Sequence, residues 1–297
     1  MISVPQHFPN FIVIGPGKSG TSWLYHVLGQ HPEVCMSTAK ETLYFEDYYH
    51  KGLDWYARFF KKCHVLNKPH AIGEISNTYI FSELAAERIA RDFPAMKIIA
   101  TLRDPTERAF SHYLFLRRNG EVNCDFEQAL DQRPDLVSRG NYHQHLQPYR
   151  DRFPSEQLAV FVFDDLVHDV EDYAHRLFSF LDIADLADPD LLHTKVLEAS
   201  EARSRWLAKA TVASAQVVRR LGFPDIVTRV KQGVLPKLIF KPLKKESKPK
   251  LVPAVERRLR EYYLPDLERL SDWLQRDLVA AWGPRVPVPI EAGGCND

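Results

Sequence analysis

The strongest constraint on the fold is a glycine-rich loop that joins an apolar run to a helical pattern near the N-terminus. Residues 11–14 are a short apolar run rich in β-branched side chains, and Gly-Pro-Gly-Lys-Ser-Gly at 15–20 ends it. Residues 21–30 then show the mixed apolar pattern of a helix, so the order is strand, tight loop, helix. Such a unit points backbone N–H groups and the positive end of the helix dipole at one place. With Lys18 in the loop, it predicts a cradle for a phosphate-like anion.

The spacing of this loop separates two classes of nucleotide site. A nucleotide kinase or NTPase uses the pattern G-x-x-x-x-G-K-[ST]. Residues 17–19, Gly-Lys-Ser, fit the second half of that pattern, but its first glycine would fall at Ile12. The Walker spacing therefore fails at a required position, and a phosphoryl-transferring kinase becomes an alternative. A glycine turn that only joins a strand to a helix is a second alternative, because such turns are common.

The same strand and helix alternation continues through the first 190 residues. Further strands are predicted at residues 71–74, 97–101 and 158–163. Helices are predicted from the Ser82 cap to about Asp92, from Asp104-Pro105 onward, and from Leu166 to Leu181. Alternating strands and helices favour a parallel sheet that is covered on both faces. We therefore predict an α/β, P-loop-like three-layer fold with a central parallel sheet flanked by helices.

The last third of the chain has a different pattern. Residues 216–250 hold ten Lys or Arg against two acids, with four prolines among Val, Leu, Ile and Phe, which predicts broken helix and loop. Residues 253–282 return to a helical pattern. Five of their side chains are predicted to face a core: Tyr262, Tyr263, Leu267, Leu270 and Trp273. We expect one domain over 1–297, with an α/β nucleotide-binding core at 1–190 and a mostly helical part at 191–297.

Composition excludes several classes of protein. Lys+Arg and Asp+Glu balance at 39 each, so no nucleic-acid partner is expected. No window approaches the roughly 18 uninterrupted apolar residues of a membrane span, and the N-terminus lacks a basic region before its apolar run. The histidines show no metal-ligand spacing. The four cysteines are scattered without metal-type pairing, which predicts reduced thiols: Cys35, Cys63, Cys124 and Cys295.

A second motif, Leu-Arg-Asp-Pro-Thr-Glu-Arg-Ala-Phe-Ser-His-Tyr at 102–113, follows a predicted strand. Arg103 ends that strand, and Ser111 lies about two helical turns further on. A guanidinium presents a planar fork of donors suited to a phosphate, and a serine hydroxyl adds a neutral donor. The motif alone also fits a helix cap with an ion pair. At the carboxyl end of a parallel strand, where open α/β sheets bind ligands, a phosphate site is the better interpretation.

These residues resemble the sulfotransferases that use 3′-phosphoadenosine 5′-phosphosulfate, and among them the heparan sulfate type, including the sulfotransferase domain of N-deacetylase/N-sulfotransferases. The resemblance covers roughly residues 8–182, with a weaker echo in the last helix. Six segments carry it: F-I-V-I-G-P-G-K-S-G-T-S-W at 11–23, H-P-E-V at 31–34, K-E-T-L-Y-F at 40–45, Y-H-K-G-L-D-W-Y at 49–56, G-E-I-S-N-T-Y at 73–79 and the motif at 102–113.

The resemblance implies a role for each donor-site residue. Lys18 contacts the 5′-phosphosulfate, and Arg103 and Ser111 hold the 3′-phosphate. Backbone amides hold the phosphosulfate as well, and they belong to Gly17, Lys18, Ser19, Gly20, Thr21 and Ser22. Glu41 is the implied catalytic base. An in-line displacement at sulfur needs the acceptor proton removed, the leaving phosphate neutralised and the partners aligned, and none of these requires a metal.

Departures from the family pattern limit the comparison. Ile75 stands where the eukaryotic polysaccharide enzymes carry a lysine, and their cysteine-bracketed Lys-Gly-Arg loop is missing. Arg203, in an Arg-Ser-Arg run like that of bacterial relatives, is predicted to contact the nucleotide instead. With no Golgi anchor, a bacterial, cytoplasmic enzyme is expected. The candidate acceptor residues are Lys40, which also fits a solvated side chain, and Glu74, Asn141, Tyr142 and His145.

We therefore predict a sulfotransferase that acts on a hydroxyl or amine of a glycan or secondary metabolite, with a lipid-linked acceptor as the second choice. After the sulfuryl group is transferred, the donor is left as adenosine 3′,5′-bisphosphate. The alternatives are the kinase and a non-catalytic nucleotide- or polyanion-binding protein. The basic segment 216–250 fits a solvated insertion, a lid over the acceptor, or a patch for an acidic partner such as a carrier protein, membrane surface or polyanion. The oligomeric state is not predicted.

Overall fold

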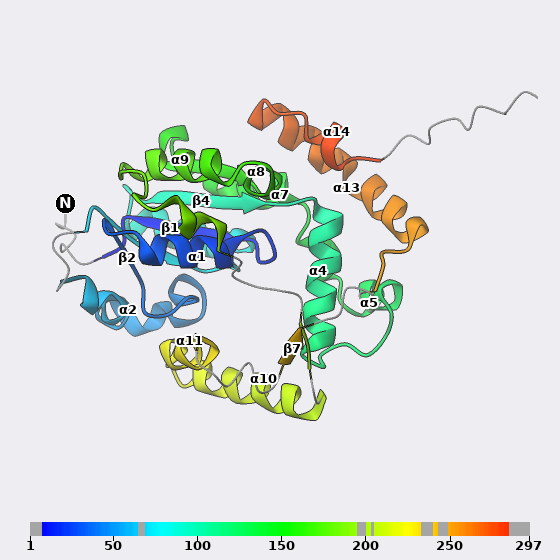
Figure 1. Ribbon diagram of the computed structural model, residues 1–297, viewed down its shortest axis with the longest axis horizontal. Helices are drawn as coiled ribbons and strands as arrows, with labels where there is room; N and C mark the ends of the chain where they lie inside the picture. Colours follow the sequence, from blue (N-terminus) through cyan, green and yellow to red (C-terminus); the bar gives the residue numbers. More distant parts are fainter. Residues whose placement is uncertain are drawn as a thin grey trace, which may run out of the picture.

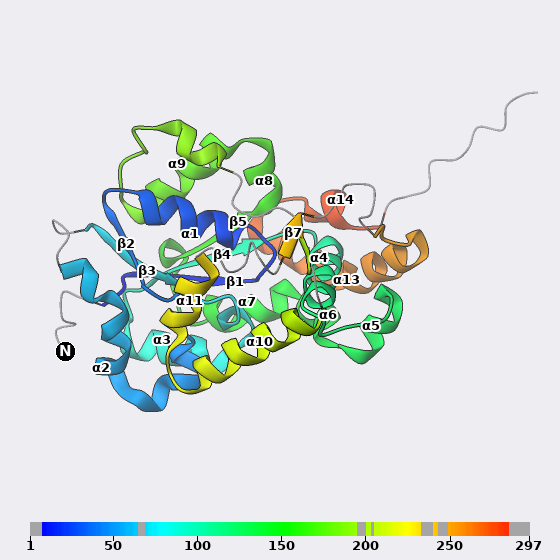
Figure 2. The same ribbon diagram turned by 60° about the horizontal axis from the view of Figure 1, so that its bottom comes forward.

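The central sheet has five parallel strands in the order β2-β3-β1-β4-β5, which are labelled in Figure 2. The computed structural model describes residues 8–64, 69–194, 200–202, 205–232, 240–242 and 249–284. The strands are β1 (Phe11–Gly15), β2 (Val34–Met36), β3 (Ala71–Ile75), β4 (Lys97–Leu102) and β5 (Leu158–Val162). The predicted parallel α/β sheet is confirmed. β2 was missed, because a strand of three residues has no readable periodicity and forms only by pairing with β3.

Helices cover both faces of this sheet (Figure 2). Alternate residues of β1 point to opposite faces, as they must in a strand. Phe11 and Val13 enter one apolar core with α1 (Thr21–Gln30) and α9 (Val170–Leu181). Ile12 and Ile14 enter the other with α3 (Glu83–Asp92), α7 (Tyr142–Arg150) and α13 (Pro253–Leu274). The remaining helical segments before residue 200 are η1 (Tyr44–Tyr48), η2 (Tyr49–Lys51), α2 (Gly52–Ala57), η3 (Arg58–His64), η4 (Tyr79–Phe81), α4 (Pro105–Arg118), α5 (Phe126–Gln132), α6 (Asp135–Ser138), η5 (Ser155–Gln157), α8 (Phe163–His168) and η6 (Pro189–His193).

Side-chain caps set several of these helix boundaries. Ser82 Oγ accepts the Ala85 N–H and begins α3, and Asp104 caps α4 ahead of Pro105, as predicted. The single helix predicted over 166–181 is wrong. It is two helices, because the carboxylate of Asp169 accepts N–H groups of the first turn of α9 and so starts a new helix there.

The C-terminal helices pack on the start of α4. α13 runs to Leu274, and α14 (Leu278–Trp282) follows it. Tyr263, Leu267 and Leu270 are buried as predicted, Trp273 is half-buried, and Tyr262 is exposed, so its predicted core position is wrong. Arg260 of α13 forms an ion pair with Asp104, with 2.9 Å between Nη2 and Oδ2 and both side chains buried. This pair fixes the C-terminal part to the helix that follows β4.

The segment after residue 190 is more regular than predicted. α10 (Arg205–Arg220) and α11 (Pro224–Gln232) form a helical hairpin that turns at Gly222, where φ is +86°. β6 (Ser200–Ala202) pairs antiparallel with β7 (Phe240–Pro242), although no strand was expected there. In Figure 1 the hairpin lies below the sheet, between α2 and the lower end of α4. Residues 233–239 and 243–248 of the segment 216–250, predicted as broken helix and loop, lie outside the described residues.

A disulfide joins Cys35 of β2 to Cys63 of η3, with 5.6 Å between their Cα atoms. Reduced thiols were expected for these two residues, and that expectation is wrong, because the fold packs η3 against β2 although 28 residues separate the cysteines in sequence. Cys124 is a free thiol, and Cys295 lies outside the described residues. Among the helices of the described residues, none has both the length and the apolar composition needed to cross a membrane.

Candidate active site

The glycine loop leaves the carboxyl end of β1, the central strand. Gly15 has a φ of +104°, and a Cβ on it would lie 2.4 Å from the carbonyl oxygen of Asn77, so only glycine fits this close approach. Gly20, with a φ of +89°, then starts α1. Within the described structure no side chain caps α1. The first N–H groups of a helix have no partner inside it, so this end of α1 is suited to an anion.

Four cations lie around the loop. Lys18 Nζ is 4.3 Å from the centre of the Phe115 ring of α4. Burial first, and then the charges of Arg118, Lys40 and Arg103, lower the pKa of Lys18 to about 8. A cation is destabilised among other cations and stabilised by an anion bound between them. The loop therefore has the electrostatics of a site for a multiply charged anion.

Arg103 stands directly after β4, at the same edge of the sheet as the loop. Its Nη2 donates to Glu107 at 2.7 Å, and its guanidinium lies 5.0 Å from the centre of the Phe163 ring. Its carbonyl oxygen accepts the hydroxyl of Tyr142 at 2.8 Å, which fixes the backbone. Ser111 follows on α4, half-buried. The two predicted 3′-phosphate residues therefore flank the first two turns of α4, with Arg103 just before its N-cap and Ser111 in its middle. Arg103 is near enough to Lys18 to affect its pKa.

Glu41 lies beside the loop and has donors on both oxygens. Asn77 Nδ2 donates to Oε1 at 3.0 Å, and Arg219 Nη2 donates to Oε2 at 2.7 Å. Asn77 also packs against the loop, since a Cβ on Gly17 would lie 3.8 Å from its Cβ. Sequence reasoning missed both partners. Asn77 had a signal, because it follows β3 inside the G-E-I-S-N-T-Y segment, whereas Arg219 is 178 residues from Glu41 and had none.

Lys40 belongs to the loop more than to solvent. Its Nζ donates to Ser22 Oγ at 2.8 Å, and its backbone N–H donates to Thr228 Oγ1 of α11 at 3.1 Å. It also contributes to the lowered pKa of Lys18. Of the two open interpretations of Lys40, the solvated side chain is therefore wrong in this structure.

Glu74 is not at the surface. The residue is fully buried, because it points from β3 into the core, and burial raises its pKa to about 7. Thr42, Tyr56 and Tyr79 surround the carboxyl and moderate that shift. The predicted contact of Glu74 with an acceptor is therefore wrong for this structure, because no solvent reaches the side chain.

The other candidate acceptor residues lie around the start of α7. Tyr142 is fully buried, so its predicted contact with an acceptor is also wrong, and it supports Arg103 instead. His145 is half-buried, 3.0 Å from the carbonyl oxygen of Ser138 and with its ring centre 5.0 Å from that of Phe81. Asn141 Nδ2 donates to the Tyr262 hydroxyl at 3.2 Å.

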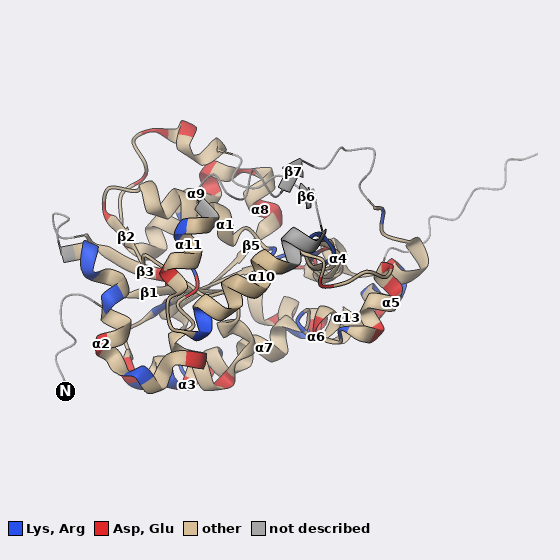
Figure 3. Cartoon of the chain, turned by 90° about the horizontal axis from the view of Figure 1, so that it is seen from below, with Lys and Arg blue, Asp and Glu red and all other residues tan. Residues whose placement is uncertain are grey.

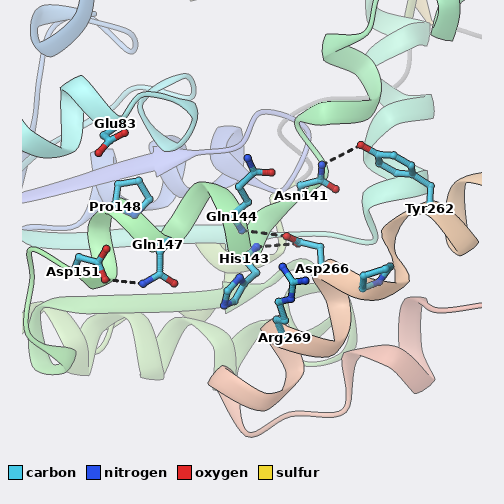
Figure 4. Close-up of a pocket in the computed structure, with 11 residues that line it drawn as sticks. Glu83, Asn141, His143, Gln144, Gln147, Pro148, Asp151, Tyr262, Asp266 and Arg269 are labelled. Carbon is cyan, nitrogen blue, oxygen red and sulfur yellow. Dashed lines mark hydrogen bonds between the residues drawn. The ribbon is translucent and has the colours of Figure 1, made fainter.

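Asn141 lines an open polar pocket of about 690 Å³ between α7 and α13 (Figure 4). Asp266 of α13 accepts the backbone N–H groups of His143 and Gln144 on its wall. No donor-site residue lines this pocket, so it is separate from the glycine loop. Among the described residues, no group of three or more His, Cys, Asp or Glu side chains is placed to hold a metal ion. Arg203 lies outside the described residues.

Comparisons with known proteins identify the family. A model of the sulfotransferase domain matches residues 8–220. The human bifunctional heparan sulfate N-deacetylase/N-sulfotransferase 2 is 32% identical over 221 residues, which are 68% of this chain and 24% of that protein. The membrane-associated sulfotransferase kil1 of Dictyostelium discoideum is 38% identical over 135 residues, which are 43% of this chain and 29% of that protein. This chain thus spans less than a third of the length of these relatives.

A solved structure has the same fold. The sulfotransferase from Alicyclobacillus acidocaldarius superposes with a TM-score of 0.65 at 22% identity, covering 93% of this chain and 98% of that one. Together with the glycine loop and the Arg103 motif, these matches show that the chain belongs to the sulfotransferase family, as its sequence predicted.

Proposed function

We propose that this protein transfers a sulfuryl group from 3′-phosphoadenosine 5′-phosphosulfate to a hydroxyl or amine, leaving adenosine 3′,5′-bisphosphate. The observation that carries the proposal is the cluster of Lys18, Lys40, Arg103 and Arg118 at the uncapped start of α1. A donor with phosphate groups at both ends of its ribose supplies the anions that such a cluster stabilises.

The donor roles follow from this cluster. Lys18 and the backbone amides from Gly17 to Ser22 hold the 5′-phosphosulfate, and Lys40 adds a charge at Ser22. Arg103 and Ser111 hold the 3′-phosphate. Arg203 is a further predicted nucleotide contact, which the described residues do not include. No metal has a role in this proposal, since Lys18 and the amides already neutralise the leaving phosphate.

Glu41 is the proposed catalytic base. Its carboxylate takes the proton of the acceptor as the new bond to sulfur forms and the bond from sulfur to the bridging phosphate oxygen breaks. The electron pair of that bond passes to the phosphate, where Lys18 stabilises it. The position of Glu41 beside Asn77, which packs on the glycine loop, supports this role because base and leaving group must lie close together.

The proposed acceptor is a glycan or a secondary-metabolite hydroxyl, with a lipid-linked acceptor second. The heparan sulfate enzymes among the relatives support a glycan. Asn141 and His145 are the remaining candidate contacts. We also propose that 1–297 is one domain, in which 1–190 carries the donor site and 191–297 completes the surroundings of Glu41.

The outer face of the α10–α11 hairpin is a proposed contact with an anionic membrane surface. Half of the large apolar side chains that are exposed among the described residues are here, namely Val217, Leu221, Phe223, Ile226 and Val230. Arg220 and Arg229 are exposed on the same two helices, so the surface also attracts negative charge. Figure 3 shows the hairpin, largely uncoloured by charge, on the face toward the viewer.

Vesicle sedimentation tests this contact. The protein is expected to pellet with vesicles that contain phosphatidylglycerol and to stay in solution with phosphatidylcholine alone. Changing both Leu221 and Phe223 to Glu should abolish pelleting, whereas Val167→Glu, at an equally exposed site on α8, should not. Equal pelleting of all three proteins would contradict the proposed membrane contact.

The cytoplasmic location stays a prediction. The Cys35–Cys63 disulfide counts against a reducing compartment.

Calorimetric titration with adenosine 3′,5′-bisphosphate, ATP and 5′-AMP tests the donor assignment. Magnesium-independent preference for the bisphosphate is expected. Arg103→Ala should weaken it about 10- to 100-fold, since a hydrogen bond to a charged group contributes about 1.5–3 kcal/mol. Arg117→Ala, at an exposed position on α4, is the matched control. Tighter binding of ATP with magnesium would favour the kinase. Glu41→Gln should bind the bisphosphate normally and lose turnover, which separates an enzyme from a binding protein.

A further inference from the structure

The α10–α11 hairpin is attached to the segment that follows the proposed base. The Tyr48 hydroxyl donates to the carbonyl oxygen of Arg219, and the Arg58 guanidinium donates to that of Gly222. Arg58 also lies 3.9 Å from Asp225 at the start of α11. These hydrogen bonds hold the backbone of the turn between α10 and α11 in place. The position of Arg219 therefore depends on main-chain contacts, and residues 219–225 are not a solvated insertion.

The side chain of Arg219 ends on Glu41. Their 2.7 Å ion pair is only about a quarter exposed, at 26% for Arg219 and 25% for Glu41. Arg219 Nε is buried and has no hydrogen-bond partner among the described residues. An unpaired buried donor costs free energy, and such a group calls for an explanation. The arginine is thus held in an unfavourable setting while its Nη2 contacts the base.

We propose that Arg219 is a positioning residue for sulfuryl transfer, which keeps Glu41 ionised and orients its carboxylate together with Asn77. The inference rests on the proposed role of Glu41 as base. A cation beside a carboxylate favours its charged form, the form that can accept a proton. Donors on both oxygens also restrict the carboxylate to one orientation, which aligns the remaining lone pairs for the acceptor. The guanidinium itself stays protonated and exchanges no proton with the substrate.

Through Arg219, the α10–α11 hairpin takes part in positioning the base, although it lies outside the segment that carries the family motifs. Residues 8–182 carry the loop, the base and the Arg103 motif, yet the second donor to Glu41 comes from α10. The base is therefore complete only when the hairpin is seated on Tyr48 and Arg58. Replacing Arg219 should change the titration of Glu41 without changing the donor site.

The test is a carbon NMR titration of the Glu41 carboxyl, identified as the signal that Glu41→Gln lacks. In Arg219→Ala the midpoint should rise by about 1–3 pH units, the effect of removing an opposite charge at this range. Arg219→Lys should restore most of that shift, and Arg220→Ala, the exposed neighbouring residue, should leave the midpoint unchanged. Binding of adenosine 3′,5′-bisphosphate shows that each variant is folded.

Turnover is followed in the same proteins as release of adenosine 3′,5′-bisphosphate from the donor, with water and with de-N-sulfated heparin as acceptors. Arg219→Ala should release it at least tenfold more slowly, and Arg219→Lys should recover only part of the rate, because an ammonium lacks the planar fork of donors. An unmoved midpoint, or faster turnover in Arg219→Ala, would overturn the inference. If Glu41→Gln keeps full turnover, the proposed base fails instead, whatever Arg219 does.

Discussion

The Nζ atom of Lys18 lies 4.3 Å from the centre of the Phe115 ring, so the lysine of the glycine loop contacts α4. Phe115 lies four residues past Ser111 on α4, the helix that also starts beside Arg103. The glycine loop is thus in contact with the helix that carries most of the 102–113 motif. This contact gives the half-buried Lys18 an aromatic face on one side.

The lowered pKa of Lys18 predicts how donor binding depends on pH. In the folded protein Lys18 loses its proton near pH 8, whereas an unfolded lysine keeps it to about 10.5. Binding of adenosine 3′,5′-bisphosphate should therefore weaken above pH 8, by up to about tenfold per pH unit, because the anion needs the charged form. Folding stability should move the other way, rising between pH 8 and 10.5 as the unfavourable buried charge is lost. Calorimetry from pH 7 to 9.5 checks the first effect.

Lys18→Arg is the matched variant for that titration. A guanidinium stays charged throughout this range, so its binding curve should be flat above pH 8. If the curve of Lys18→Arg declines in parallel with that of the wild type, another group is responsible for the pH dependence.

The buried carboxyl of Glu74 predicts a loss of stability as the pH rises. Its pKa is about 7 when folded and about 4.5 when exposed, so the folded state holds the proton more tightly between these values. The free energy of unfolding should fall across this window by about 3 kcal/mol and level off above pH 7. Urea denaturation of wild type and Glu74→Gln at pH 5 and pH 8 measures the effect, which the amide variant should lack. Glu83→Gln, at an exposed carboxyl, should behave like the wild type.

The two arginines Arg258 and Arg260 of α13 should differ sharply in their contribution to stability. Arg260 is buried against Asp104 and also donates to the carbonyl oxygen of Trp282 at 2.6 Å. Arg260→Ala should lower the free energy of unfolding by about 3–5 kcal/mol, because it removes the counter-ion of the buried Asp104 carboxylate. Arg258 pairs with Glu127 in solvent, so Arg258→Ala should cost at most about 1 kcal/mol. Similar losses in the two variants would mean that the Arg260 pair is solvated.

The disulfide between Cys35 and Cys63 predicts a stability that depends on the redox state. Reduction with dithiothreitol should lower the free energy of unfolding by about 2–4 kcal/mol. The double change Cys35→Ala and Cys63→Ala should show the same loss and no further response to reductant. Cys124→Ala should keep the full response, since this thiol is free. A wild type that ignores the reductant would show that the bond is absent in solution.

Much of the candidate donor site could be proposed from the sequence because the features that indicate it are local. A strand, a glycine turn and a helix start adjoin in sequence, so Lys18 and the loop amides could be proposed as an anion site without any tertiary contact. Arg103 was predictable for the same reason, since Asp104 caps the helix that follows and Pro105 suits its first turn. Hydrogen bonds over two to four residues define these features.

Other features depended on segments far apart in the chain. Burial of Glu74 follows from how β3 lies between neighbouring strands and beneath Tyr56 and Tyr79, which no local pattern reveals. Lys40 was ambiguous until α11 supplied Thr228 and the loop supplied Ser22. The sequence around a charged residue does not show whether its side chain is solvated or held in a site.

The sequence by itself determined the α/β class, the glycine loop between β1 and α1, and the place of Arg103 directly after β4, because periodic burial and helix capping act over a few neighbouring residues. Only the tertiary structure decided that Arg219 meets Glu41, that Cys35 meets Cys63, and that Glu74 is buried. The disulfide joins residues 28 apart in sequence, and the ion pair joins residues 178 apart. The burial of Glu74 depends on the place of β3 inside the sheet. Their geometry depends on how the complete core packs, and no short-range pattern encodes that.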